Sequence, residues 1–442
     1  MTDLLKAEHV IEAKWVIPIV PRGRVLENSA LVINDGKVAA ILPIAEARQT
    51  YLAQKTTVLA DHVLIPGLIN LHAHAAMSLM RGFADDLALM NWLEQRIWPA
   101  EREALSERFV RDGTLLASAE MLRGGVTCFN DMYFFPQAAA EAVDEAGIRA
   151  NLGLVLLEFP SAYAGDADDY LHKGLAARDA LHGHDRITTC LAPHAPYTIS
   201  DRTFGKVLTY ADQLGLSLHL HLHETRDEII QSESQYGLRP IQRLAGLGLL
   251  GPNLLAAHCV HLTQGEIELL ATQGCHVAHC PTSNLKLGSG IAPITLLNDA
   301  GVNVGLGTDG AASNNRLDIF AEMRLTALLS KSSGDASTLP AAQALEMATI
   351  NGASALGLDD KIGSIEVGKL ADLVAVDFSS PELSPCFDPL SHLVYVAGRE
   401  HVSHTWVSGT LRYQRDVYDS VDPIELKEIA SSWQSRLKPF HH

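Results

Sequence analysis

Apolar and polar positions follow two different periods along the middle of the chain. Between residues 63 and 355, short apolar runs typical of buried strands alternate with longer stretches of helical periodicity, such as 201–214 and 264–273. Glycine closes several of these helices, as at Gly147, Gly215 and Gly274. The apolar runs cover residues 63–74, 126–131, 149–158, 187–194, 217–223, 254–259, 275–280 and 302–309. Eight sequential β/α units predict a (β/α)8 TIM barrel, whereas an open doubly wound sheet would need a crossover at a switch point.

Both chain ends have a different pattern, with short strands and turns. Residues 30–42 hold two apolar runs around Asn34-Asp35-Gly36, which predicts a hairpin, and residues 368–377 return to a strand pattern. We therefore expect the two ends to combine into one small β-sandwich domain. The predicted domains are 1–62 for the N-terminal part of the sandwich, 63–367 for the barrel, and 368–442 for the C-terminal part and tail.

Composition narrows the range of partners. The formal net charge of −18 disfavours binding to nucleic acids and to anionic membranes, and no uncharged run approaches the roughly 20 residues of a membrane span. The six cysteines are scattered without a C-x-x-C pair, which is typical of reduced thiols, and the N-terminal residues lack the pattern of a signal peptide. We expect a cytoplasmic homo-oligomer that acts on a small molecule.

The first barrel strand ends in two histidines. In the run Ile65-Pro-Gly-Leu-Ile-Asn-Leu-His-Ala-His74, His72 and His74 are two residues apart, so both side chains point to one face of the strand. Two neutral imidazoles on a rigid strand are half of a zinc site. Catalytic groups of a parallel barrel gather at the C-terminal strand ends, so we expect further strand-end residues nearby. These residues are His194, His221, His258 and Asp309.

This arrangement resembles that of the amidohydrolase superfamily over nearly the whole chain. His72 and His74 match its strand-one motif, while His221, His258 and Asp309 match its residues on strands five, six and eight. The resemblance implies that His72, His74, His221 and Asp309 bind the metal. Two-metal members carry a lysine on strand four, and residues 187–194 contain none, so we expect one Zn²⁺ per chain, although the same ligands suit Fe²⁺.

A carboxylate three residues after a metal ligand indicates the type of reaction. In His221-Leu-His-Glu224, Glu224 leaves the strand above the predicted metal. The resemblance to aromatic deaminases implies that Glu224 protonates a ring nitrogen, Asp309 takes a proton from the attacking water, and His258 steadies the oxygen. The zinc signature of cytidine deaminases is absent.

The segment after strand one indicates the substrate. Residues 90–101, predicted to be a helix over the barrel mouth, and residues 307–315 resemble the 5′-methylthioadenosine/S-adenosylhomocysteine deaminase family. The resemblance implies that Glu101 binds the ribose hydroxyls, His194 contacts the nucleoside and Trp92 packs against it. Together with Glu224 and Asp309, these residues are the expected substrate-binding residues. We interpret Trp98 as helix packing and His219 as barrel packing.

We therefore expect zinc-dependent deamination of an adenosine-type thioether nucleoside to its inosine analogue and ammonia. Residues 159–181 carry four aspartates and only Lys173 and Arg178 as cations, so we expect 5′-methylthioadenosine to be preferred over S-adenosylhomocysteine, with adenosine as a further substrate. One alternative is a guanine, pterin or s-triazine aminohydrolase or chlorohydrolase, for which Glu101 would have no use. The other is a catalytically inactive barrel that serves as a scaffold.

Overall fold

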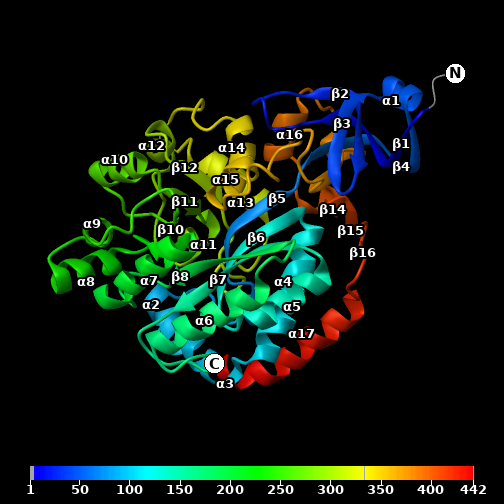
Figure 1. The fold of residues 1–442 in the computed structure, drawn as a ribbon. Coiled ribbons are helices and arrows are strands. Elements are labelled where there is room, and N and C mark those ends of the chain that lie inside the picture. The colour runs from blue at the N-terminus through cyan, green and yellow to red at the C-terminus, as the bar shows by residue number, and fades with distance from the viewer. Residues whose placement is uncertain (1–3, 333, 442) are drawn as a thin grey trace. The chain divides into compact units, whose positions relative to one another are not determined.

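The computed structural model describes residues 4–332 and 334–441, and its central feature is an eight-stranded parallel barrel (Figure 1). The strands neighbour one another in chain order, as expected for sequential β/α units. They are β5 (Leu68–Ala73), β6 (Val126–Tyr133), β7 (Arg149–Leu156), β8 (Ile187–Pro193), β9 (Leu218–Leu222), β10 (Leu254–His258), β11 (His276–His279) and β12 (Asn303–Leu306). The predicted TIM barrel is thus confirmed.

Helices follow the barrel strands. They are α4 (Glu107–Arg123), α5 (Pro136–Ala146), α6 (Ala167–Leu181), α7 (Asp201–Leu214), α8 (Arg226–Tyr236), α9 (Pro240–Gly246), α10 (Gln264–Gln273), α11 (Pro281–Lys286), α12 (Ile294–Asp299), α13 (Ile319–Leu329), α14 (Ala341–Met347) and α15 (Ile350–Ala355). Gly147, Gly215 and Gly274 end their helices in the left-handed conformation, as predicted. Among the helices that the structure describes, none is long and apolar enough to cross a bilayer.

The barrel closes where its first and last strands meet. The backbone N–H of Asp309 donates to the carbonyl of His72 over 2.9 Å, and the N–H of Thr308 donates to Oδ1 of Asn70 over 2.9 Å. Gly307 allows this approach, because a Cβ at that position would lie 2.8 Å from the backbone nitrogen of His72. Closure therefore brings two residues of the predicted metal site into direct contact.

The segment between β5 and α4 is helical but irregular. It contains η1 (Ala75–Met80), α2 (Leu89–Trp92), the π-helical turn η2 (Leu93–Ile97) and α3 (Trp98–Ala104). The predicted helix over residues 90–101 is confirmed, with a π-helical turn that the sequence pattern does not reveal.

Strands from both chain ends form a second, mixed sheet with the order β16-β15-β14-β13-β4-β1-β2-β3. These strands are β1 (Leu5–Val16), β2 (Leu26–Asn34), β3 (Lys37–Pro43), β4 (Tyr51–Pro66), β13 (Leu373–Asp377), β14 (Val402–Val407), β15 (Thr410–Gln414) and β16 (Val417–Tyr418). The pairing of β2 with β3 confirms the predicted hairpin. One face buries a cluster that includes Ile11, Leu31, Leu64 and Trp406. The remaining helices are α1 (Ile44–Thr50), η3 (Pro381–Leu383), α16 (Pro389–Tyr395), η4 (Arg399–His401), α17 (Pro423–Leu437) and η5 (Lys438–Phe440).

The run predicted as one strand over residues 63–74 is in fact two strands. β4 ends at Pro66 in the mixed sheet, and β5 begins at Leu68 in the barrel. The apolar pattern continues through the break because both segments are buried, so hydrophobicity alone cannot show the change of sheet.

The chain separates into two compact units. One comprises the chain up to Ile69, with Met121–Cys128 and Asp318–Ser420, and the other comprises Asn70–Glu120, Phe129–Leu317 and the chain from Val421 onward. The boundaries placed after residues 62 and 367 from the sequence stay a prediction.

We expect Gly307→Ala to destabilise the protein. The added methyl group would meet the backbone of His72, and overpacking of this kind typically costs about 1–3 kcal/mol. Gly205→Ala in α7 is the matched control, because a Cβ there meets no heavy atom within 4 Å and alanine favours a helix. Chemical denaturation of both variants tests this expectation. Equal stability of Gly307→Ala and the wild type would show that closure tolerates a side chain at this position.

Candidate metal centre and substrate cavity

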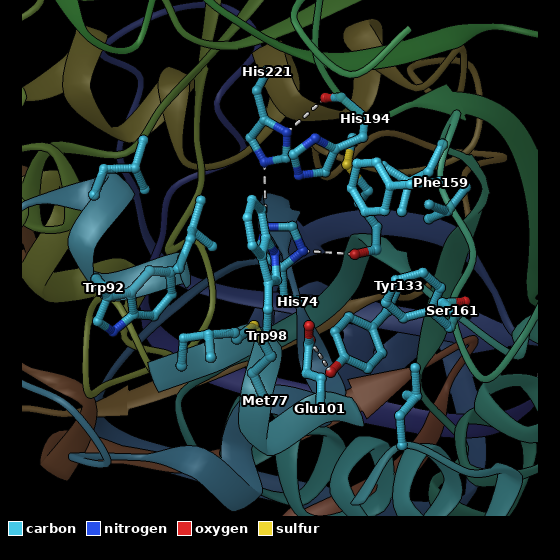
Figure 2. A pocket seen from close by; sticks show the side chains of 18 of the residues that line it. His74, Met77, Trp92, Trp98, Glu101, Tyr133, Phe159, Ser161, His194 and His221 are labelled. Atoms are coloured by element: carbon cyan, nitrogen blue, oxygen red, sulfur yellow. Dashed lines mark hydrogen bonds between the residues drawn. The ribbon is translucent and has the colours of Figure 1, made fainter. Parts of the chain in front are cut away.

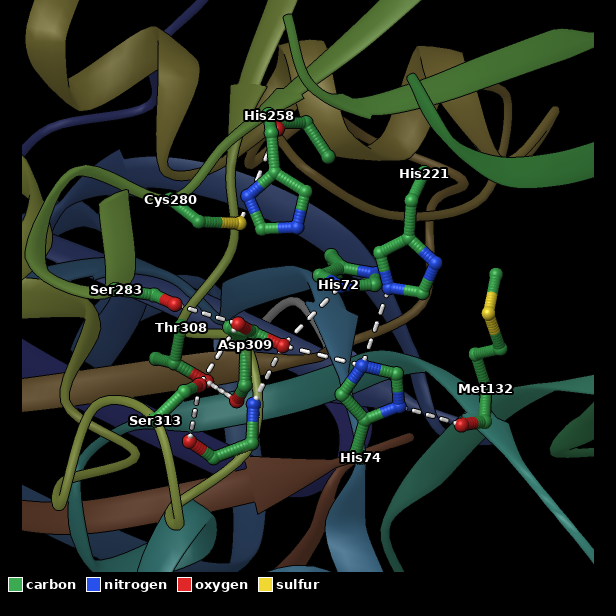
Figure 3. Close-up of polar contacts among 12 residues, drawn as sticks. His72, His74, Met132, His221, His258, Cys280, Ser283, Thr308, Asp309 and Ser313 are labelled. Carbon is green, nitrogen blue, oxygen red and sulfur yellow. Dashed lines mark hydrogen bonds and ion pairs between the residues drawn. The ribbon is translucent and has the colours of Figure 1, made fainter. Parts of the chain in front are cut away.

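Five side chains from four strand ends surround one point inside the barrel mouth (Figure 3). Nε2 of His72 and Nε2 of His74 lie 3.3 and 3.1 Å from Oδ1 of Asp309. Nε2 of His221 lies 3.3 Å from Nε2 of His74. His258 completes a second group of ligand atoms with His72 and His221. The structure thus brings together the four residues predicted to bind the metal, and it places His258 beside them.

The orientation of the imidazoles is fixed by hydrogen bonds on their outer side. Three rings donate Nδ1–H to an oxygen that can only accept, so each directs its Nε2 at the common point. The acceptors are the carbonyl of Met132 for His74 (2.6 Å), the carbonyl of His194 for His221 (2.7 Å) and Oδ1 of Asn284 for His258 (2.8 Å). His74 and His221 are thus preorganised as ligands, and His258 presents its Nε2 to the same point.

His219 does more than pack in the barrel interior, the role interpreted from the sequence, because it also contacts His72. Its Nε2 lies 2.9 Å from Nδ1 of His72, and the side chain is 1% exposed. When Nδ1–H of His72 donates to His219, the Nε2 of His72 stays available to a metal. The alternating pattern Leu218-His219-Leu220-His221 carries the signal for this contact, because both histidines point to the barrel interior.

Asp309 uses its two carboxylate oxygens differently. Oδ2 accepts hydrogen bonds from the hydroxyl groups of Ser283 (2.6 Å) and Ser313 (2.7 Å). Oδ1 accepts from the N–H of Gly310 and faces the two histidines of the first strand. The serines leave Oδ1 as the oxygen available to a metal, and the sequence pattern had identified neither serine.

The charges of the cluster, mainly neutral imidazoles around one buried carboxylate, suit the binding of one cation. Burial lowers the pKa of His72 to about 4, and burial among other imidazoles lowers the pKa of His221 well below its usual value, so both rings are neutral. Burial also opposes protonation of His74, but the hydrogen bond and charge of Asp309 prevail and raise its pKa to about 9. The buried Asp309 carboxylate therefore demands a positive charge at this point.

The residues present fit a zinc ion. Ligands about 2.0–2.1 Å from a tetrahedral metal lie roughly 3.3 Å apart, which matches the observed spacings of 3.1–3.3 Å. Within the described residues, Nε2 of His72 is buried without a hydrogen-bond partner, as expected of a metal ligand. β8 contains no lysine, so the chain offers no bridging group of that kind for a second metal.

Glu224 leaves β9 on a turn that a second carboxylate holds in place. Oε1 and Oε2 of Glu228 accept the backbone N–H groups of His223 (2.9 Å) and Glu224 (2.8 Å). His223 adopts a positive φ of 54°, a conformation that non-glycine residues rarely adopt. Glu224 is 5% exposed, burial raises its pKa, and its Oε2 lies 3.8 Å from Nε2 of His258. The turn therefore presents a buried carboxyl group beside the metal centre.

A cavity of about 550 Å³ opens in front of these groups (Figure 2). Its lining includes all five residues predicted to bind substrate, which are Trp92, Glu101, His194, Glu224 and Asp309, together with His74, His221 and His258. Apolar side chains make up most of the remaining wall, among them Met77, Leu105, Phe134, Val155, Leu157 and Phe159. Trp98 also lines the cavity and contacts Phe159 with ring centroids 6.0 Å apart, so its interpretation as helix packing was incomplete.

Only the first residues of the acidic segment after β7 line the cavity. Residues 159–162 do so, whereas the aspartates that follow contact other residues. Asp166 caps α6, Asp168 pairs with Lys206, and Asp169 pairs with Lys173. Repulsion of a substrate carboxylate by these aspartates therefore has no support in the geometry.

Known proteins share this architecture and much of the sequence. The amidohydrolase family model matches residues 63–412. A Teredinibacter turnerae protein named 5-methylthioadenosine/S-adenosylhomocysteine deaminase is 46% identical over 441 residues, which cover 99% of each chain. A Methanosarcina mazei protein named 5′-deoxyadenosine deaminase is 44% identical over 412 residues, or 92% of this chain and 93% of that protein.

A solved structure extends the similarity to three dimensions. The zinc-bound crystal structure of an adenosine deaminase from Xanthomonas campestris has a TM-score of 0.97 and 46% identity, and the match covers 99% of this chain and 100% of that one. With the family model and the full-length relatives, this similarity shows that the chain belongs to the amidohydrolase family, among the relatives of 5-methylthioadenosine/S-adenosylhomocysteine deaminases.

Proposed function

We propose that this protein is a zinc-dependent aminohydrolase that converts an adenosine-type thioether nucleoside to its inosine analogue and ammonia. The observation that carries the proposal is one cavity with the ligand cluster and Glu224 at its inner end and Glu101 in its wall. The names of the relatives, which describe deaminases of methylthioadenosine, S-adenosylhomocysteine and 5′-deoxyadenosine, support the same reaction class.

Four residues would hold the zinc: His72, His74, His221 and Asp309. When bound, Zn²⁺ lowers the pKa of a coordinated water molecule and so supplies a nucleophile near neutral pH. The fixed Nε2 directions of the imidazoles and the serine-bound Asp309 support this assignment.

The remaining chemistry is proton transfer by this chain's own side chains. Asp309 accepts a proton from the attacking water on its carboxylate, which the hydroxyl groups of Ser283 and Ser313 hold in place. Glu224 enters the reaction as a carboxylic acid, consistent with its raised pKa, and donates to the ring nitrogen beside the carbon under attack. His258, whose Nδ1–H donates to Asn284, directs Nε2 at the attacking water and steadies it by accepting a hydrogen bond from its O–H. Asp309 then passes its proton to the amino group, which leaves as ammonia, and the new hydroxyl group on the carbon returns a proton to Glu224, so that a carbonyl remains and both carboxyl groups regain their starting states.

Substrate recognition uses the cavity wall. His194 contacts the nucleoside as a neutral imidazole, because burial lowers its pKa to about 3. Trp92 covers an apolar part of the substrate, and Glu101 accepts hydrogen bonds from the ribose hydroxyls. A base without ribose would leave the Glu101 carboxylate without this partner, which favours a nucleoside over guanine, a pterin or an s-triazine.

We further propose that the protein works in the cytoplasm as a homo-oligomer. The acidic composition supports a small-molecule role away from nucleic acids and anionic membranes. Light scattering on the purified protein measures the subunit number, and a monomeric mass at working concentrations would contradict the expected oligomer.

We expect one tightly bound zinc per chain. His72→Ala removes a ligand from a buried site and should lose zinc and activity together, since three remaining ligands hold the ion more weakly. His172→Ala, on the exposed side of α6, is the control and should keep its zinc. Elemental analysis gives the metal content directly. Two equivalents that are both required for turnover would contradict the single-metal assignment.

We expect Glu224→Gln to keep its fold and its zinc but to lose most of its rate. The amide occupies the same space but is a far weaker acid, and general acid–base groups typically contribute on the order of 10²–10⁴-fold. Glu233→Gln, an exposed position on the following helix, should have wild-type kcat. Ammonia release under saturating substrate measures both variants, and near wild-type turnover of Glu224→Gln would remove this residue from the mechanism.

We expect a higher kcat/KM for 5′-methylthioadenosine than for S-adenosylhomocysteine. The aromatic and aliphatic lining suits a methylthio group, while the charged tail of S-adenosylhomocysteine must be desolvated. Arg102 also lines the cavity and makes no ion pair with any residue in the described ranges, so the same kinetics should be measured in Arg102→Gln. An equal or higher wild-type value for S-adenosylhomocysteine that falls only with this variant would instead identify Arg102 as a carboxylate ligand.

A further inference from the structure

The cavity contains a tyrosine–carboxylate pair that the proton-transfer steps do not use. The hydroxyl of Tyr133, at the end of β6, donates to Oε1 of Glu101 on α3 over 2.6 Å (Figure 2). Both side chains line the cavity, and Tyr133 is 5% exposed. The two residues are 32 positions apart in the sequence, so no local pattern predicts their contact.

Glu101 depends on this hydroxyl. Burial raises the pKa of Glu101 to about 7, while the hydrogen bond from Tyr133 acts in the opposite direction and favours the carboxylate. Among the residues that the structure describes, no cation lies within ion-pair distance of Glu101, and Tyr133 is its one side-chain hydrogen-bond donor. Oε2 is therefore the oxygen left for a ligand.

Tyr133 is held rigidly with respect to the metal centre. The two residues before it contact His74 and the residue that follows it, because the carbonyl of Met132 accepts from His74 (2.6 Å) and Asp131 accepts the N–H of Ala75 (2.7 Å). A strand is stiff over three residues, so the phenol has a defined distance from the metal ligands. Through its hydroxyl, the strand fixes the Glu101 carboxylate, which belongs to a separate and irregular helical segment.

We propose that Tyr133 is a specificity-determining positioning residue that makes Glu101 selective for a cis-diol. The inference rests on the proposed nucleoside deamination. With Oε1 held by the phenol, the carboxylate plane is fixed, and Oε2 accepts from the vicinal 2′- and 3′-hydroxyls. A 2′-deoxynucleoside leaves part of this buried acceptor without a donor, which costs affinity. Without the phenol, the carboxylate rotates and accepts from a single hydroxyl almost as well as from two.

The proposal predicts a change in selectivity rather than a general loss of activity. Wild-type kcat/KM for a ribonucleoside should exceed that for its 2′-deoxy analogue by on the order of 10- to 100-fold. Tyr133→Phe should reduce this ratio about tenfold, mainly by raising KM for the ribonucleoside. The 2′-deoxy substrate should change little, and kcat should stay close to the wild-type value.

The experiment compares adenosine with 2′-deoxyadenosine in four proteins: the wild type, Tyr133→Phe, Glu101→Gln and the double variant. If Tyr133 acts through Glu101, the double variant should be no less selective than Glu101→Gln alone. Tyr163→Phe is the control, because its buried hydroxyl has no hydrogen-bond partner in the described structure and does not line the cavity. Zinc content and thermal unfolding are measured for every protein, so that a folding defect is recognised. Glu101→Gln tests the same pair from its other side if Tyr133→Phe is unstable.

Three results would overturn the proposal. An equal loss on both substrates would show that Tyr133 only supports the fold. An unchanged ratio in Tyr133→Phe would show that Glu101 needs no partner. Equal binding of adenosine and 2′-deoxyadenosine by the slow Glu224→Gln protein would exclude diol recognition while the deaminase function stands. Separately, failure of that protein to bind either nucleoside would contradict the proposed deaminase function itself.

Discussion

The hydrogen bond between the Asp309 amide and the His72 carbonyl joins the last strand of the barrel to the first, and it also joins two of the residues proposed to bind the metal. Closing a parallel sheet requires its first and last strands to meet, and in this chain they meet at two of the proposed ligands. The absence of a side chain at Gly307 makes that contact possible. The geometry of the metal centre is therefore a consequence of barrel closure, and both depend on the same few atoms.

The charges of the buried carboxyl groups are a second constraint on the site. Asp309 is a buried carboxylate whose pKa is held well below its usual range by its histidine partners, against the effect of burial. Glu224 and Glu228 lie in the same part of the barrel, where burial raises the pKa of both, that of Glu228 to about 8. Similar groups thus have opposite tendencies: the carboxylate that faces two histidines stays ionised, and the two carboxyl groups on which burial has the larger effect favour the proton. This division suits a reaction in which one carboxyl group accepts a proton and another donates one.

Much of this arrangement could be predicted from the sequence, because period-2 and period-3.6 patterns are local. The grouping of five residues could be predicted because the C-terminal ends of all barrel strands meet at one rim, so residues at strand ends lie close together. These residues are His72, His74, His221, His258 and Asp309. The groups that orient them were not, because Ser283 reaches Asp309 from 26 residues away and Tyr133 reaches Glu101 from 32 residues away. The break at Gly67 was missed for another reason: both strands are buried, so hydrophobicity does not change where the chain leaves one sheet for the other.

The hydrogen bonds that orient His74 and His221 have a consequence for how such a protein diverges. Their acceptors are the backbone carbonyls of Met132 and His194, whose side chains line the cavity. A substitution at either position changes the surface that a substrate meets but leaves the carbonyl in place. Substitutions at these two positions can therefore change substrate specificity without weakening the hydrogen bonds that orient the proposed metal ligands. This separation offers a physical reason why one barrel with one set of ligands can serve many substrates, and why cavity libraries built at these two positions should yield folded, metal-loaded proteins.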